Sequence, residues 1–139
     1  MKTVYPVIFT KLDNGYAAHA PDFPIDTQGD TLAEAIEMAR DAIGITGIDM
    51  EDENKPLPKP STPENINCKI NEFISMIDID FLEYRRANEQ RTIRRNVSLP
   101  SWLNIEAEKA GINVSALLQS ALKKELQVNE PYKYYKVSK

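Results

Sequence analysis

The chain has 139 residues, enough for one domain or two small ones, and 42% of them are apolar, which favours a folded core over disorder. No apolar run is long enough for a transmembrane helix, and the first residues do not lead into the apolar core of a signal peptide. We therefore expect a cytoplasmic protein without membrane contact. The single cysteine, Cys68, excludes an internal disulfide and is expected to be buried or half-buried.

The formal net charge of −4 conceals two parts of opposite sign. Residues 1–83 carry 6 Lys and Arg against 16 Asp and Glu, a net −10, and residues 84–139 carry 11 against 5, a net +6. The acidic part would repel nucleic acid and attract a basic partner, whereas the basic part has the charge that phosphate binding requires. The charge pattern thus predicts two modules with different partners.

Residues 3–28 have the pattern of three short strands. β-Branched and aromatic side chains fill residues 3–10, Asp13-Asn14-Gly15 is a strong hairpin signal, and residues 16–20 have the pattern of the return strand. Pro6 indicates an edge strand or an irregularity, because proline cannot donate a backbone hydrogen bond. Residues 25–28 follow as a third strand.

A helix is predicted after Gly29, with Asp30 or Thr31 as its N-cap and its end near Gly44 or Gly47. Its apolar residues share one face: Leu32, Ala35, Ile36, Ala39 and Ile43.

Two further segments complete the first module. After an acidic stretch and the proline-rich loop 55–60, residues 71–81 have the pattern of a fourth strand. Residues 84–90 are polar and resemble a linker, with a helix as the alternative conformation. The order strand, strand, strand, helix, strand predicts an α+β module over residues 1–83, in which the helix covers one face of a sheet.

Residues 91–128 predict a second module of one strand and two helices. Side chains alternate over residues 91–99, and Pro100 ends the strand. Gly111 suits the C′ position of the first helix, and Asn113 suits the N-cap of the second, whose apolar face extends to Leu126. The strand presents two opposite sets of side chains, namely Ile93, Val97 and Leu99 against Arg94, Asn96 and Ser98.

One strand and two short helices do not close a core, and a lone strand leaves its edge groups unpaired. We expect two copies to pair these strands about a two-fold axis, giving a homodimer or a higher homo-oligomer. The outer face of the ribbon, with Arg94, Asn96 and Ser98, would then read bases in the DNA major groove. Backbone N–H groups at Asn113 and Val114 would hold a phosphate. The alternative is a merely solvated strand face, and residues 129–139 are expected to be a tail.

Two resemblances support this division. Val97-Ser-Leu-Pro100 and Gly111-Ile-Asn-Val-Ser-Ala-Leu-Leu118 resemble a ribbon-helix-helix DNA-binding domain. Residues 1–83 resemble the HicB antitoxin family of type II toxin–antitoxin systems, most specifically in Thr27-Gln-Gly-Asp-Thr-Leu-Ala-Glu-Ala35, and also in Tyr5-Pro6-Val7-Ile8-Phe9, Gly15-Tyr16 and Pro21-Asp22-Phe23-Pro24.

The HicB resemblance implies a degenerate ribonuclease-H-like sheet without nuclease activity or a cofactor. It also implies that the chain binds HicA, a small basic mRNA-cleaving ribonuclease toxin, occludes the toxin's active site and represses its own operon by binding operator DNA. Four residues near the hairpin are candidate toxin contacts: Tyr16, His19, Asp22 and Phe23. Tyr16 and Phe23 are equally consistent with positions in the core.

Two other function classes stay open. A metal-dependent ribonuclease-H-like nuclease needs several converging carboxylates, and Asp78 and Asp80 share one face of the predicted strand. No third carboxylate is placed by its spacing, and His19 has no partner for a metal set, so we expect no catalytic residue and no metal. A DNA-binding transcriptional regulator with a ligand-sensing first module is the other class, although nothing in the sequence marks a ligand pocket.

Overall fold

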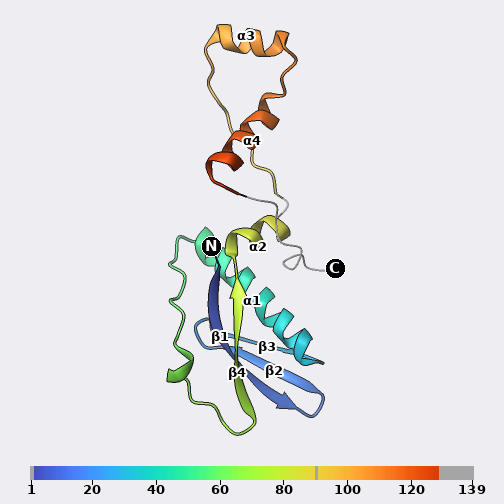
Figure 1. Cartoon of the computed structure of the whole chain (residues 1–139), viewed down its shortest axis with the longest axis vertical. Helices are drawn as coiled ribbons and strands as arrows, with labels where there is room; N and C mark the ends of the chain where they lie inside the picture. Colours follow the sequence, from blue (N-terminus) through green and yellow to red (C-terminus); the bar gives the residue numbers. More distant parts are fainter. Residues whose placement is uncertain (1, 90, 129–139) are drawn as a thin grey trace. The chain divides into compact units, whose positions relative to one another are not determined.

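The computed structural model describes residues 2–89 and 91–128, and these residues divide into two compact units at this gap. Unit 1 is residues 2–89 and unit 2 is residues 91–128, and each is described by itself (Figure 1). The tail predicted over residues 129–139 lies outside the described residues.

A four-stranded antiparallel sheet is the framework of unit 1. Its strands are β1 (Thr3–Leu12), β2 (Gly15–Ala20), β3 (Ile25–Gly29) and β4 (Glu72–Ile79), in the order β3-β2-β1-β4 (Figure 1). The hairpin between β1 and β2 turns at Asp13-Asn14, as its sequence predicts, with Leu12 opposite Gly15. The mixed α+β class predicted from the order of elements is therefore confirmed.

Pro6 does not mark an edge strand, because β1 lies between β2 and β4. The Lys11 N–H donates to the Asn71 carbonyl at 3.3 Å, so odd-numbered residues of β1 direct their backbone groups toward β4. The nitrogen of Pro6 therefore faces the β2 side, and pairing with β2 begins only at Ile8 opposite His19. Proline costs no hydrogen bond there, which is why a central strand tolerates it.

Helix α1 (Leu32–Asp52) covers one face of the sheet (Figure 1). Of the two predicted N-caps, Thr31 has this role, because its hydroxyl accepts a hydrogen bond from the Glu34 N–H at 3.1 Å. The predicted end at Gly44 or Gly47 is wrong. The helix continues to Asp52 and closes with Asn54 at φ 58°, where the N–H groups of residues 54 and 55 donate to the carbonyls of residues 51 and 50.

A second helix, α2 (Phe81–Asn88), replaces both the end of the predicted fourth strand and most of the predicted linker. The Asp80 side chain caps it by accepting the Glu83 N–H at 3.2 Å. Phe81 and Tyr84 are 6% and 2% exposed, so residues 84–88 belong to the packed part of unit 1 rather than to a solvated linker. The polar composition of the segment concealed these two buried aromatic residues.

Two glycines of α1 make room for these aromatic rings. A Cβ at Gly44 would lie 2.6 Å from the ring of Tyr84, and a Cβ at Gly47 would lie 2.1 Å from Cε1 of Phe81. Real side chains do not approach so closely, so glycine here serves helix packing rather than helix termination. This contact explains why a residue type that favours helix ends occurs within α1.

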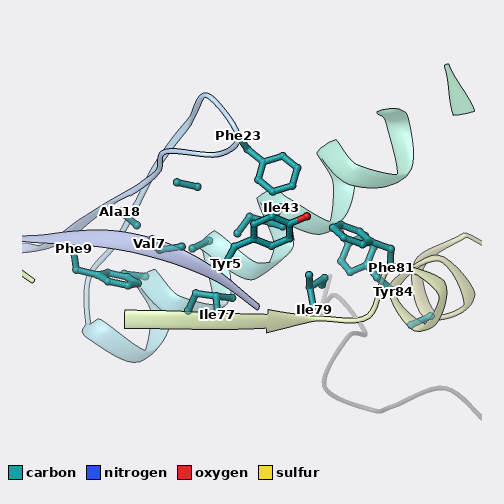
Figure 2. Close-up of a cluster of buried hydrophobic side chains, with 14 residues drawn as sticks. Tyr5, Val7, Phe9, Ala18, Phe23, Ile43, Ile77, Ile79, Phe81 and Tyr84 are labelled. Carbon is teal, nitrogen blue, oxygen red and sulfur yellow. The ribbon is translucent and has the colours of Figure 1, made fainter. Parts of the chain in front are cut away.

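The core of unit 1 lies between α1 and the sheet and continues to α2 (Figure 2). Tyr5 stands at its centre, with its ring 4.8 Å from that of Phe23 and 6.4 Å from that of Phe81. The Tyr5 hydroxyl donates to the Pro58 carbonyl at 2.8 Å, which holds the loop between α1 and β4 against the core. This loop contains one short 3-10 helix, η1 (Pro63–Asn65). The other fully buried large side chains are Phe9, Ile43, Ile77, Ile79, Val7 and Pro6.

Unit 2 contains the two predicted helices, α3 (Ser101–Lys109) and α4 (Val114–Glu125). Gly111 has φ 67° and Asn113 accepts the Ala116 N–H at 3.0 Å, so the predicted C′ and N-cap roles are confirmed. Residues 91–99 form neither helix nor strand in the single chain, since no neighbouring strand is present to pair with them. Among the described residues of unit 2, none is buried.

The glycine contact generates a stability prediction. Gly47→Ala should lower the free energy of unfolding of unit 1 by about 1–3 kcal/mol, because the new methyl group overlaps the Phe81 ring. The gain in helix propensity, about 1 kcal/mol, opposes this effect without cancelling it. Urea unfolding followed by far-UV circular dichroism measures the change.

A double-mutant cycle supplies the control. Phe81→Leu removes part of the ring that the methyl group meets, so the loss in the double variant should be smaller than the sum of the two single losses. Additive losses, or a Gly47→Ala chain as stable as the parent, would show that this contact does not require glycine.

Candidate functional site

The predicted DNA-reading residues lie on one exposed segment of unit 2. Arg94, Asn96 and Ser98 are all exposed, and they occupy alternate positions of a segment that has no regular structure in the single chain. The chain alone therefore does not assemble them into a ribbon. What it provides is an accessible basic segment, with Arg91 and Arg95 adding to its charge.

The predicted phosphate contacts lie at the start of α4. Asn113 and Val114 are exposed, and the first turn of the helix carries no acidic side chain. The positive end of the helix dipole is therefore not neutralised by a carboxylate of its own turn, and it is suited to an anion.

The four candidate toxin contacts divide into buried and exposed groups. Phe23 is 1% exposed and belongs to the core, and Tyr16 is half-buried against Phe73 at a ring distance of 6.3 Å. Asp22 accepts the Ser61 N–H at 2.9 Å as well as the Ser61 hydroxyl proton, which ties the β2–β3 loop to the loop before β4. Only His19 has a large exposed fraction, 46% of its side chain.

His19 lies on the sheet face opposite α1, because Ala18 and Ala20 on either side of it are buried beneath the helix. Its Nδ1 is 2.8 Å from an oxygen of Asp26 on β3. The strand register continues this row from His19 to Ile8 and then to Ile74. We call this surface the open face; its residues are Val4, Ile8, His19, Asp26, Ile74 and Met76.

The apolar part of the open face was missed by the sequence analysis. Val4 and Met76 are each 42% exposed, and Ile8 and Ile74 are half-buried. Their even positions in β1 and β4 put them on this face, opposite the buried odd positions. The apolar residues of this face were therefore visible in the sequence. Because both strands are apolar on both faces, the alternation does not reveal which face is covered.

The two carboxylates considered for metal binding serve structural roles. Asp78 forms ion pairs with Lys2 and Arg40, each at 3.1 Å, and Asp80 caps α2 instead of lying in the strand. The hydrogen bond from Lys2, together with the Arg40 guanidinium, holds the pKa of the Asp78 carboxyl below its usual value. Within the described residues, no group of three His, Cys, Asp or Glu side chains is placed to hold a metal ion.

Two remaining features bear on the alternatives. Cys68 is exposed, so the expectation of a buried or half-buried thiol is wrong, because the residue lies in the loop before β4. A hollow of about 460 Å³ beside the β1–β2 hairpin is lined mainly by polar and backbone groups from residues 12–16 and 28–30.

Among the described helices, none is both long and apolar enough to cross a membrane.

The geometry defines a class of protein: an acidic α+β unit with an open sheet face, joined to a two-helix unit that leaves its apolar side chains exposed. Comparison with protein families identifies the class, since residues 5–121 match the HicB_like antitoxin of bacterial toxin-antitoxin system. The chain belongs to this family.

Several known proteins are similar to this chain. A chain of a toxin–antitoxin complex from Streptococcus pneumoniae is 28% identical, with a TM-score of 0.58 over 90% of this chain and 99% of that one. The antitoxin HicB of Burkholderia pseudomallei has the same fold, at 22% identity and a TM-score of 0.54 over 91% of this chain and 99% of that one. A 14.9 kDa protein from Haemophilus phage HP1 is 28% identical over 134 residues, 94% of this chain and 86% of its own length.

The ion pairs of Asp78 generate a pH prediction. Asp78→Asn should lower the free energy of unfolding near pH 7 by at most about 1 kcal/mol, because the carboxylate is 43% exposed and its pairs are screened. A depressed pKa in the folded state means that this stability is present above the ordinary value of 3.8 and is lost as the pH falls through the folded value. Denaturant unfolding at pH 7 and at a series of decreasing pH values below 3.8 follows this loss.

Asp13→Asn, in the exposed hairpin turn, is the matched control and should change stability little at every pH of the series. A loss in Asp78→Asn that is equally large at low pH would mean that the carboxylate charge is not the cause.

Proposed function

We propose that this chain is an antitoxin that binds a small basic HicA-type ribonuclease, occludes the active site that cleaves mRNA, and represses its own operon as a dimeric ribbon-helix-helix protein. The observation that carries the proposal is the family match over residues 5–121. The charge division supports it, since an acidic unit suits a basic toxin and a basic segment suits DNA. The chain would act in the cytoplasm and would itself be non-catalytic.

For the toxin we propose the open face as the contact surface. It combines exposed apolar side chains at Val4 and Met76 with a polar border at His19 and Asp26. Buried apolar contacts supply most of the affinity in protein interfaces, whereas charges chiefly accelerate the encounter. Phe23 is excluded as a direct contact in this arrangement, because its ring is enclosed in the core.

The proposal is tested with a small basic protein of the HicA type. That protein should cleave mRNA when purified, and an equimolar amount of the antitoxin should suppress the cleavage. Asp26→Lys on the open face should slow association by about tenfold at low salt, because like charges then face each other during the encounter. RNA cleavage and the kinetics of complex formation are the two measurements.

Glu108→Lys in unit 2 makes the same charge change on an exposed residue and is the matched control. Equal slowing by the two variants would assign the effect to net charge and remove the open face from the proposal. Absence of any inhibition by the parent chain would contradict the antitoxin mechanism itself.

For DNA we propose a dimer formed through residues 91–128, with residues 1–83 as the toxin-binding domain. The support is the exposed apolar surface of unit 2: Trp102 is 66% exposed, Leu117 59% and Leu122 51%. A second copy would cover these side chains and would pair residues 91–99 as an antiparallel ribbon. Arg94, Asn96 and Ser98 would then occur twice on the face that enters the major groove.

Arg94→Ala should reduce discrimination between operator and unrelated DNA by about 1–3 kcal/mol per half-site, the range of a bidentate contact to a base. Arg95→Ala removes the same charge from the opposite side of the strand. It should therefore lower affinity for both DNAs alike and leave the discrimination intact. Titrations of operator and scrambled duplexes at two salt concentrations measure both effects.

Leu118→Asp places a charge in the surface that the second copy would cover, so it should abolish the dimer and all tight DNA binding.

If Arg94→Ala and Arg95→Ala have the same effect on operator and unrelated DNA, Arg94 is a phosphate contact and does not read a base.

A ligand-sensing regulator remains the alternative of a different class. The hollow beside the hairpin is the only observation that favours it, and this hollow is polar and offers few apolar walls to a small molecule. The nuclease alternative is weaker, because Asp78 and Asp80 are already engaged by two cations and by a helix N-terminus.

A further inference from the structure

The outer edge of β4 is a free sheet edge. β4 is the last strand of the sheet, and its neighbour on the other side is β1. Because the Asn71 carbonyl accepts from Lys11 on β1, odd-numbered residues here direct their backbone groups toward β1. The even-numbered Ile74 and Met76 therefore direct theirs outward. Among the residues that the structure describes, none pairs with the backbone of these two.

The free stretch is short, because contacts within unit 1 occupy both of its ends. At one end the Glu72 N–H donates to the Lys69 carbonyl at 3.0 Å. At the other end the Asp78 carbonyl accepts from Nε of Arg40 at 3.1 Å. Two N–H groups and two carbonyl groups remain between these ends, and they are arranged symmetrically about Ser75.

The opposite edge of the sheet, formed by β3, has a different character. The register carries the same alternation across β2, so Asp26 and Gln28 are the residues of β3 with outward backbone groups. Both are exposed, and the Asp26 side chain is charged and 82% exposed. Such side chains protect an edge from strands of other molecules. The outward residues of β4, Ile74 and Met76, are apolar and give no such protection.

A second copy of β4 fits this vacancy. In an antiparallel pair with its two-fold axis at Ser75, Ile74 of each copy lies opposite Met76 of the other, and each such pair exchanges two hydrogen bonds. The two pairs together use all the vacant N–H and carbonyl groups. A shift of the axis by one residue in either direction would require the Glu72 N–H or the Asp78 carbonyl, and both are already engaged.

The same register pairs apolar side chains on both faces of the sheet. On the open face, Ile74 meets Met76 of the second copy. On the helix face, Phe73 meets Ile77 of the second copy. Phe73 stacks on Phe9 at a ring distance of 5.6 Å and is 39% exposed in the single chain, so the second copy would cover it. Aromatic and β-branched pairs are among the combinations that stabilise neighbouring strands.

One pair in this register opposes like charges, namely Glu72 and Asp78 of the second copy, which by itself would weaken the sheet. The Asp78 carboxylate, however, lies 3.1 Å from Nζ of Lys2 and 3.1 Å from a guanidinium nitrogen of Arg40. Each pair of carboxylates is therefore accompanied by two cations. The Arg40 guanidinium also bonds the outward Asp78 carbonyl, so it lies on the side from which the second copy approaches.

We propose that two copies of this chain associate through the outer edges of β4, so that two four-stranded sheets become one continuous antiparallel sheet. The two open faces then form a single surface. The contact is short, and small interfaces are weak, so the association depends on concentration. It is separate from the dimer proposed for unit 2 and does not depend on the toxin or DNA proposals.

A disulfide cross-link tests the register. The two residues at position 75 would form a non-hydrogen-bonded pair with Cα atoms about 4.5 Å apart, a distance that a disulfide spans. Full-length chain with Cys68→Ser and Ser75→Cys should therefore form a covalent dimer in a glutathione redox buffer, visible on a non-reducing gel.

Met76→Cys in the same Cys68→Ser background is the matched control. In this register the two new cysteines are offset by two residues along the strands, which separates their Cα atoms by more than the roughly 7 Å that a disulfide tolerates. Cross-linking at position 76 should therefore be at least about tenfold slower than at position 75.

A proline variant tests the hydrogen bonds. The full chain with Leu118→Asp, which removes the surface proposed for dimerisation of unit 2, should show a monomer–dimer equilibrium in analytical ultracentrifugation. Met76→Pro in this background removes an outward donor without breaking the pairing with β1, so it should weaken the dimer by about tenfold or more. Gln28→Pro makes the same kind of change on the β3 edge and should leave the equilibrium unchanged, while circular dichroism confirms that both variants fold.

Three outcomes would overturn the proposal. Absence of a cross-link at position 75, or equal cross-linking at positions 75 and 76, would contradict the register. A Leu118→Asp chain that is monomeric at every concentration would show that no second copy closes the edge. Protection of the Ile74 and Met76 N–H groups from hydrogen exchange that appears only when a HicA-type toxin is added would assign the edge to that partner.

Discussion

The close approach of α2 to α1 is the contact on which the arrangement of unit 1 depends. Gly44 and Gly47 leave space into which the rings of Tyr84 and Phe81 fit. The Tyr84 hydroxyl then donates to Asp41 at 2.5 Å, and burial of this phenol raises its pKa. Because α2 is the last element of unit 1, these two glycines decide where the chain leaves the acidic unit.

Charge pairing completes the attachment of α2. Arg85 donates to the Ile48 carbonyl at 3.2 Å and lies 3.0 Å from an Asp52 oxygen. The guanidinium therefore meets the carboxyl-terminal turns of α1, where a cation is favoured by the helix dipole. Aromatic packing at one end of the contact and a cation at the other fix the direction of α2 more closely than either does alone.

Sequence rules that use only neighbouring residues correctly predicted the turns and helix caps. The Asp13-Asn14 turn, the Thr31 cap and the Gly111 C′ position depend on residues within a few positions of one another, and the structure has each of them. The errors arose where a residue far along the sequence determines the local structure. Gly47 resembles a helix end in the sequence, but Phe81, 34 positions further along, makes it an internal packing residue.

The candidate sites show the same division. Alternation over residues 91–99 predicts a basic set and an apolar set on opposite faces of a strand. In the single chain both sets are exposed and the segment is not a strand, because a strand needs a neighbour with which to pair. Near the hairpin, composition alone did not tell His19 from Phe23. The pleat of β2 turns His19 to the open face, whereas the loop after β2 turns Phe23 inward against Tyr5.

Asp80 has a further consequence for the integrity of unit 1. It is the only residue between β4 and α2, and its side chain caps the helix. A connection of one residue ties the end of the strand to the start of the helix. Loss of the cap would therefore weaken the first turn of α2 and the adjoining end of β4 together.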